Sequence, residues 1–238
     1  MKITGLNSKI YIFFGAVLTI ITSSSSSLQA QNPVIVKKTK SYIQQTNQDS
    51  LHRMVEIKNH VPFVVYDLRY ATAGNFTKQQ LYANNRHTYL RLPAVNALAN
   101  VQRELKEKGL GIKVFDAYRP YSVTKKMWEL IKDERYVANP AKGSGHNRGL
   151  AIDLTLVHLQ SGEELNMGTG FDHFSDTAHH SFKALSNEIL ENRKLLREAM
   201  IRNGFQPLET EWWHYSWPND RNYPVLDLSF KELAKLAY

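Results

Sequence analysis

The sequence contains no cysteine among its 238 residues. Disulfide bonds are therefore excluded, and so are cysteine nucleophiles and thiolate metal ligands. The stability of the fold must come from its core or from a bound metal. Any metal site must be built from imidazole and carboxylate groups.

Runs of basic residues are also missing. No stretch holds five or more consecutive lysines or arginines, and no nucleic-acid-binding motif is present. The formal net charge is +8, and the two lysines of the first thirty residues leave +6 for the remainder. This excess favours anionic neighbours such as envelope polymers, and we expect no nucleic-acid partner.

An apolar run long enough to span a bilayer comfortably is absent, because the run at residues 10–21 is too short. This run follows Lys2 and Lys9, and a serine tract and small residues near Ala30 come after it. The order predicts a secretory signal peptide at residues 1–30. No cysteine follows, which excludes a lipoprotein. We expect an exported protein of the bacterial periplasm without stable membrane insertion; an uncleaved N-terminal anchor is the alternative.

The rest of the chain is long enough for one sizeable domain. Its hydrophobic content of 42% and charged content of 22% are ordinary for a soluble globular protein. Residues 31–50 are polar and unpatterned, and we interpret them as a polar N-terminal arm or linker. Residues 51–238 are then expected to form a single domain.

Periodic hydrophobic residues in this domain predict both helices and strands. Helices are expected at residues 92–109, 121–134 and 186–204. Strands are expected at residues 111–118, 150–159 and 205–217, and a strand that leads into a loop is expected at residues 62–72. Ser186 and Gly204 suit the cap and the end of the last helix. Because the strands and helices do not alternate regularly, the pattern favours the α+β class.

One short segment, SGHNRGLAID at residues 144–153, brings an imidazole and a carboxylate into the same stretch. In the expected strand Asp153 shares a face with Ala151 and Thr155, so its carboxylate is held by rigid backbone. The glycines allow the preceding loop to fold back and carry His146 beside it. The pair therefore suits two ligands of one divalent ion.

A third protein ligand is usual in a zinc site, and His214 in EWWHY is the best candidate. Glu211 lies three residues earlier, where it could accept a proton from attacking water, although the HExxH motif is absent. Residues three apart on a regular strand face opposite sides, so we expect a bend or bulge here. Taken singly, such residues are more often structural. That interpretation is kept for His52, His60, His87, His158, His179 and His180.

Four separated stretches, taken in this order, resemble the zinc-dependent D-alanyl-D-alanine dipeptidases, a group that includes the vancomycin-resistance dipeptidases. They are DLRYATAGNF (67–76), FDAYRP (115–120), SGHNRGLAID with MGTGFD (167–172), and EWWHY (211–215). The resemblance runs from about residue 55 to the C-terminus. It implies a small single α+β domain with a central, largely antiparallel sheet flanked by helices.

The same resemblance implies roles for particular residues. It implies one Zn²⁺ per chain, held by His146, Asp153 and His214. It implies Glu211 as the catalytic acid and base, and Arg119 as the stabiliser of the transition state. Without the resemblance, Arg119 would be interpreted as part of a surface salt bridge.

The substrate implied by the resemblance is the free dipeptide D-Ala-D-Ala. Ser144, Tyr70 and Asp172 match positions that line the dipeptide pocket, with Asp172 suited to bind the ammonium group. A packed, structural tyrosine is the alternative for Tyr70. Ala73 and Gly74 stand where resistance-type relatives tend to carry a bulky aromatic and an acidic residue. The exported N-terminus also departs from the cytoplasmic resistance enzymes.

Two other functions fit the same sequence. The first is a periplasmic zinc D,D-carboxypeptidase or endopeptidase that acts on peptidoglycan stem peptides. The second is a zinc-containing envelope protein that binds its ligand without turnover. The presence of Glu211 and Arg119 argues against the second.

The signal-peptide interpretation predicts that the mature protein begins near Gln31. N-terminal sequencing of protein recovered from the cell envelope should find this start, because signal peptidase removes the leader after small residues. Recovery of a chain that retains Met1 from the soluble cytoplasm would contradict the prediction.

Overall fold

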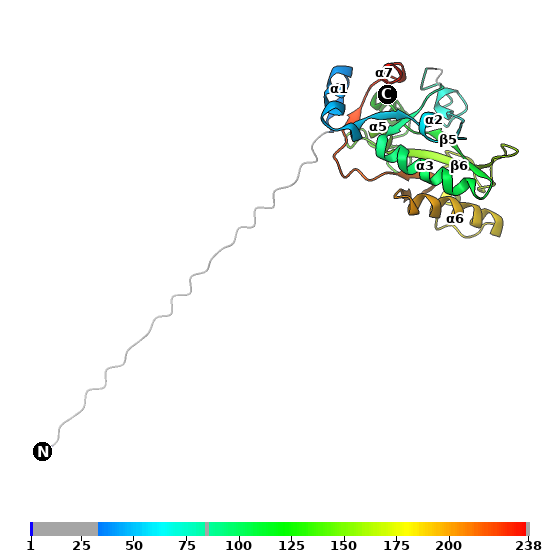
Figure 1. Cartoon of the computed structure of the whole chain (residues 1–238). Helices are drawn as coiled ribbons and strands as arrows, with labels where there is room; N and C mark the ends of the chain where they lie inside the picture. Colours follow the sequence, from blue (N-terminus) through cyan, green and yellow to red (C-terminus); the bar gives the residue numbers. More distant parts are fainter. Residues whose placement is uncertain (2–32, 84–85, 237–238) are drawn as a thin grey trace. The chain divides into compact units, whose positions relative to one another are not determined.

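The computed structural model describes Met1, residues 33–83 and residues 86–236. Apart from Met1, the expected signal peptide and its cleavage site next to Gln31 lie outside the described residues. Within them, no helix has both the length and the apolar character needed to cross a membrane. Figure 1 shows the elements coloured along the chain.

The described residues form short strands and helices of mixed order. The strands are β1 (Ile35–Val36), β2 (Met54–Glu56), β3 (Val65–Tyr66), β4 (Tyr89–Arg91), β5 (Leu110–Asp116), β6 (Ala151–His158), β7 (Gln206–Leu208), β8 (Glu211–Ser216) and β9 (Val225–Leu226). The α-helices are α1 (Thr39–Gln48), α2 (Ile57–His60), α3 (Leu92–Lys106), α4 (Tyr121–Leu130), α5 (Gly145–Arg148), α6 (Asn187–Arg202) and α7 (Phe230–Lys235). The 3-10 turns are η1 (Ser50–His52), η2 (Arg69–Ala71) and η3 (Asp176–Ala178).

The central sheet has the strand order β3-β5-β6-β8-β7. Only β3 and β5 run parallel; the pairs β5–β6, β6–β8 and β8–β7 are antiparallel. Two small pairs lie outside this sheet, β1 with β9 and β2 with β4. The expected α+β class with a largely antiparallel central sheet is therefore confirmed.

Helices α3 and α6 pack against each other and against the sheet, α3 on β5 and α6 on β7 and β8 (Figure 1). Strand β6 supplies Ile152 and Leu154 to the core cluster that also holds Leu98 of α3 and Leu196 of α6. All four side chains are fully buried. Since side chains alternate along a strand, Asp153 points to the opposite face of the sheet.

Three expected elements differ from the structure. Of the strand and loop expected at residues 62–72, only Val65–Tyr66 (β3) is a strand, and Arg69–Ala71 form the 3-10 turn η2. The strand expected at residues 205–217 is a hairpin of β7 and β8, because the chain turns at residues 209 and 210. Residues 33–48, interpreted as a linker, contain β1 and α1. Tyr42 of α1 is 1% exposed, and its hydroxyl accepts a hydrogen bond from the Met54 amide at 2.7 Å. The inward residues of this polar helix are Tyr42, Thr46 and the partly buried Ile43, which are too few to be recognised as an amphipathic face.

His146 lies on the one-turn helix α5 rather than in the expected loop. Ser144 caps this helix: its hydroxyl accepts from the Asn147 amide, and its own amide donates to Asn147 Oδ1, both at 3.1 Å. Gly149 then ends the turn with a left-handed φ of 68° and leads directly into β6. The glycines therefore close a helical turn and do not simply loosen a loop.

Gly149 offers a test of this geometry, with Gly162 as the matched control. Both have left-handed φ values, 68° and 76°, but a Cβ at Gly149 would lie 2.5 Å from Met54 Sδ, whereas one at Gly162 has nothing within 4 Å. We expect Gly162→Ala to lower the free energy of unfolding by ~1–2 kcal/mol, the cost of left-handed backbone. Gly149→Ala should cost clearly more, since buried Met54 must move.

The measurement is urea unfolding of both variants together with titration by zinc. Gly149→Ala should also weaken metal binding, because it shifts His146 relative to β6, and Gly162→Ala should not. Equal losses of stability and equal zinc affinity in the two variants would rule out this role for Gly149.

Candidate metal centre

Three polar residues lie in one row across neighbouring strands of the central sheet. Asp116 of β5 is paired with Asp153 of β6, and Asp153 is paired with His214 of β8. A bulge at Phe115 shifts the register of β5, since Val114 pairs with Leu154 but Asp116 pairs with Asp153. The bulge therefore places two carboxylates directly opposite each other, which no local sequence pattern predicts.

A second irregularity in the sheet brings Glu211 to the same place. Pro207 of β7 pairs with Tyr215, and the next residue, Leu208, pairs with Glu211, so three residues of β8 bulge out between them. Glu211 Oε2 lies 3.9 Å from His214 Nδ1. The bulge expected from the spacing of these two residues is confirmed.

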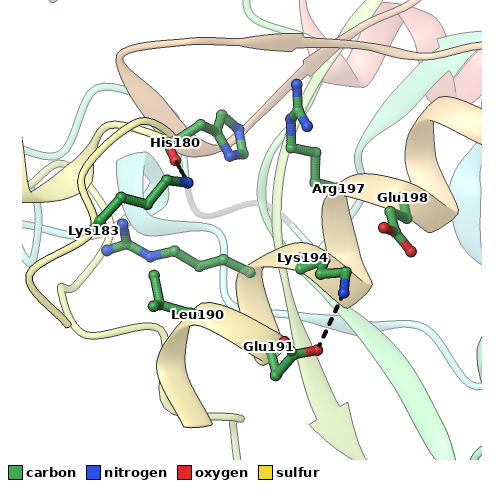
Figure 2. A pocket seen from close by; sticks show the side chains of 8 residues that line it. His180, Lys183, Leu190, Glu191, Lys194, Arg197 and Glu198 are labelled. Carbon is green, nitrogen blue, oxygen red and sulfur yellow. Dashed lines mark hydrogen bonds and ion pairs between the residues drawn. The ribbon is translucent and has the colours of Figure 1, made fainter. Parts of the chain in front are cut away.

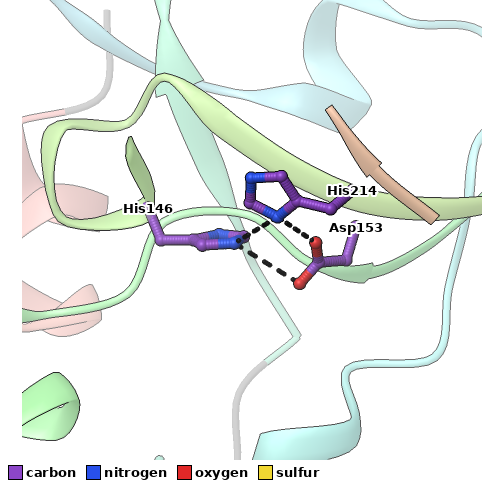
Figure 3. A group of neighbouring side chains, drawn as sticks. All are labelled: His146, Asp153 and His214. Carbon is purple, nitrogen blue, oxygen red and sulfur yellow. Dashed lines mark hydrogen bonds and ion pairs between the residues drawn. The ribbon is translucent and has the colours of Figure 1, made fainter. Parts of the chain in front are cut away.

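His146, Asp153 and His214 converge, and Figure 3 shows the two rings directed at the one carboxylate. His146 Nε2 lies 3.3 Å from His214 Nδ1 and 3.4 Å from Asp153 Oδ2, and His214 Nδ1 lies 2.9 Å from Asp153 Oδ1. A tetrahedral zinc ion with bonds of ~2.0–2.1 Å keeps its donors about 3.4 Å apart. The three donors therefore need little movement to hold such an ion.

Each imidazole is oriented through its other nitrogen. His146 Nδ1 hydrogen-bonds to the Ala117 carbonyl at 2.7 Å, and His214 Nε2 lies 3.2 Å from the Ser216 hydroxyl. These contacts leave His146 Nε2 and His214 Nδ1 for the centre of the group. Partners of this kind fix the ring orientation and the tautomer of metal-binding histidines.

The charges of the group suit a cation. Burial alone would raise the pKa of Asp153, but the imidazoles of His146 and His214 hold that pKa below its usual range. Asp153 is 3% exposed, so its charge is barely shielded by water. A buried carboxylate between two imidazoles is a donor set that zinc and similar divalent ions prefer.

Arg119 is fixed beside the group by Asp116. Its Nε and Nη2 both donate to Asp116 Oδ2, at 3.0 and 2.8 Å, and its guanidinium lies 5.0 Å from the ring centre of Tyr70. Burial would lower the pKa of Arg119, but the carboxylate of Asp116 holds it well above its usual value. The surface salt bridge considered for Arg119 is wrong, since the residue is 7% exposed.

Asp116 is the residue of this site that the sequence did not single out. It is fully buried, accepts from Arg119, and lies 3.7 Å from His146 Nδ1. The Tyr82 hydroxyl donates to its other oxygen at 2.8 Å. The available signal was an acidic residue at the end of a largely apolar strand, where a buried carboxylate requires a partner.

Glu211 is nearly buried and has the properties of a proton carrier. Burial raises its pKa to about 7, even though His214 opposes the shift. A carboxyl group with a pKa near neutrality can accept a proton and return it at ordinary pH.

The residues expected at the substrate pocket lie at two places. The Tyr70 hydroxyl donates to Asp172 at 3.0 Å, so Tyr70 is both packed and hydrogen-bonded. Asp172 has a left-handed φ of 59°, a strained conformation for a residue other than glycine. Burial, followed by the charge of Asp153, raises the pKa of Asp172 well above its usual value. Ser144 lies apart from this pair, at the cap of α5.

A cavity of about 290 Å³ opens onto the metal group. Among the residues that line it are Arg119, Ser144, His146, Glu211 and His214. Its lining also includes residues that the sequence did not suggest, among them Glu134, Arg135, Tyr136 and Leu208. Tyr70, Asp153 and Asp172 are not among the lining residues. The remaining described histidines are outside the metal-binding group.

Comparison with known proteins gives a consistent family. A family model described as D-ala-D-ala dipeptidase matches residues 50–235. The D-alanyl-D-alanine dipeptidase of Escherichia coli K12 is 35% identical over 173 residues, which cover 73% of this chain and 89% of that protein. The protein of the same name from Enterococcus faecalis V583 is 35% identical over 187 residues, covering 70% and 92%.

Among solved structures, a vancomycin-resistance D,D-pentapeptidase, VanY, in complex with Zn(II) is 17% identical and has a TM-score of 0.36. The match covers 56% of this chain and 75% of that one.

The geometry of the group predicts which residues a bound metal needs. His146→Ala, Asp153→Ala and His214→Ala should each lose most of the bound zinc, because each removes one of three donors. Glu211→Ala is the matched control: it removes a neighbouring carboxylate and should keep the metal. Elemental analysis after dialysis decides the matter, and full zinc occupancy in the three ligand variants would refute the assignment.

Proposed function

This chain belongs to the D-Ala-D-Ala dipeptidase family, and on that premise we propose that it hydrolyses free D-alanyl-D-alanine to two molecules of D-alanine. We propose one zinc ion as its cofactor, held by His146, Asp153 and His214. The observation that carries the proposal is the convergence of these three side chains beside a cavity that His146, His214 and Glu211 line.

A bound zinc ion would supply Lewis-acid chemistry, polarising the scissile carbonyl and making attacking water more acidic. Glu211 is proposed to accept the proton of that water and to deliver it to the leaving amine. Its side chain lies beside His214, and its pKa of about 7 suits both steps. General acid and base catalysis of this kind typically contributes ~10²–10⁴-fold.

Arg119 is proposed to stabilise the negative charge that develops on the carbonyl oxygen. Asp116 holds the guanidinium in place before the substrate arrives, so no reorganisation is needed in the transition state. The carbonyl oxygen of Arg119 is also fixed, because Asn147 Nδ2 donates to it at 2.8 Å. The charge is therefore positioned by contacts on both its side chain and its backbone.

Two ends of the dipeptide need recognition. We propose that Asp172, which accepts a hydrogen bond from Tyr70, binds the ammonium group of the substrate. Burial raises the pKa of Asp172, and a bound ammonium group would lower it again and favour the ionised carboxylate. The Ser144 hydroxyl accepts from the Asn147 amide, which leaves its own proton free to be donated to the substrate.

We also propose that the protein acts after export, in the periplasm. The basic, apolar and small-residue pattern of residues 1–30 supports this location, as does the positive charge of the remaining chain. Free dipeptide and peptidoglycan fragments are then both substrates that the enzyme could meet.

The test measures steady-state hydrolysis of D-Ala-D-Ala, of L-Ala-L-Ala and of a muropeptide that ends in D-Ala-D-Ala, with and without zinc. We expect zinc-dependent turnover of free D-Ala-D-Ala above that of the other two. Glu211→Ala should retain its zinc and lose at least ~10²-fold in kcat, because it removes the proposed proton carrier. Arg119→Ala should also retain zinc and lose kcat more than KM, and Arg119→Lys should recover only part.

Three outcomes would contradict the proposal. Faster release of D-alanine from the muropeptide would favour a carboxypeptidase. Zinc binding without turnover of any substrate would favour a binding protein. Near-normal kcat in zinc-loaded Glu211→Ala would overturn the mechanism while leaving the family unaffected.

A further inference from the structure

A second cavity, of about 370 Å³, is lined by residues of α6 and of the segment before it (Figure 2), and it shares no lining residue with the cavity at the metal group. Its lining residues are His180, Lys183, Leu190, Glu191, Arg193, Lys194, Arg197 and Glu198. The ring of His180 lies 6.2 Å from that of Tyr215 in β8. Tyr215 follows His214 in the strand and pairs with Ile152, so it faces the helix-covered side of the sheet. We call this cavity the α6 cavity.

The α6 cavity carries an excess of positive charge. Both of its carboxylates are engaged, Glu191 with Lys194 at 3.6 Å and Glu198 with Arg202 at 3.5 Å. Lys183 donates to a main-chain carbonyl, that of His180, at 3.1 Å. Within the described part of the chain, no ion pair neutralises Lys183 or Arg197.

Arg193 adds a third charge at the base of the α6 cavity. Its guanidinium donates to three main-chain carbonyls, those of Met167, Thr177 and His179, at 2.8, 2.9 and 3.3 Å. The side chain is held rigidly and is 5% exposed, but its charge has no acidic partner among these contacts. A buried cation of this kind lowers the cost of placing an anion nearby.

His180 contributes a buried polar atom that has no hydrogen-bond partner among the described residues. Its Nε2 is shielded from solvent, as is the unpartnered hydroxyl of Tyr215. Burial, and then the charge of Arg197, lower the pKa of His180 to about 4, so the ring is neutral at ordinary pH. The neutral ring therefore adds no positive charge to the cavity, whose charge comes from Lys183, Arg193 and Arg197.

We propose that the α6 cavity binds a compact dianion, either a phosphate monoester or a dicarboxylate. Lys183 and Arg197 supply the charge, and the ring of His180 lines the cavity beside them. The volume of about 370 Å³ is far more than the roughly 10–15 Å³ that one water requires, so the cavity has room for an organic body beyond one anionic group. Leu190 offers an apolar contact for that body.

The test is calorimetric titration of the zinc-loaded protein with four probes: inorganic phosphate, N-acetylglucosamine 6-phosphate, succinate, and neutral N-acetylglucosamine. The double variant Lys183→Gln with Arg197→Gln removes the two free charges. Its matched control is Lys125→Gln with Arg103→Gln, an exposed pair on α4 and α3 outside the cavity. The His180 ring signals, assigned in an NMR spectrum with His180→Asn, report where the probe binds.

We expect at least one charged probe to bind, to shift the His180 signals, and to bind at least tenfold more weakly to the Lys183 and Arg197 double variant. The control variant should bind normally, and added salt should weaken binding. Binding of the phosphate ester alone or of succinate alone identifies the preferred anion, and either supports the proposal. Unchanged affinity in the double variant, binding without a His180 shift, or equal binding of the neutral sugar would overturn it. None of these readouts depends on dipeptide hydrolysis.

Discussion

Two carboxylates buried side by side in the central sheet, Asp116 and Asp153, determine how the metal centre is assembled. Two like charges at this depth are stable only with cationic or hydrogen-bonding partners. The guanidinium of Arg119 donates hydrogen bonds to Asp116. The imidazoles of His146 and His214 lie against the carboxylate of Asp153. The need to neutralise one pair of acids therefore brings together residues from β5, β8, α5 and the segment before α4.

The segments that carry these partners are themselves fixed by buried arginines. Arg91 is fully buried and donates to the carbonyls of Arg148, His52 and Pro224, which ties the end of α5 to two distant segments. Arg193 does the same for the segment around Asp172, through the carbonyls of residues 167, 177 and 179. A guanidinium has five donors in a rigid plane, so it can order several loop carbonyls at once. The site thus owes its rigidity to hydrogen bonds that are not part of its chemistry.

The hairpin of β7 and β8 separates two chemically different surfaces. His214 and Glu211 contribute to the metal centre, whereas the neighbouring Tyr215 lies under the basic cavity beside α6. The two surfaces are connected at the turn of this hairpin, where the His180 amide donates to the Glu209 carbonyl at 2.9 Å. Because side chains alternate along β8, the metal centre lies on one face of the sheet and the basic α6 cavity lies on the other.

The sequence alone determined the elements whose signal is local. The apolar alternation of β6 placed Asp153 on the face away from the core, and the three-residue spacing of Glu211 and His214 required the bulge that β8 has. Helix α6 and its Ser186 cap were likewise readable, because periodicity and capping act within a few residues. The motif resemblance then supplied the roles that spacing could not.

Tertiary structure alone decided the contacts between distant segments. Asp116 meets Asp153 only because a bulge at Phe115 sets the register of β5 against β6, and register is fixed by pairing across the sheet. The hydroxyl of Tyr42 ties α1 to the distant Met54 amide, and Lys183 and Arg197 face one cavity only after α6 has packed on β7 and β8. Such contacts depend on where whole elements come to rest, and that position is set by burial of the common core rather than by any local run of residues.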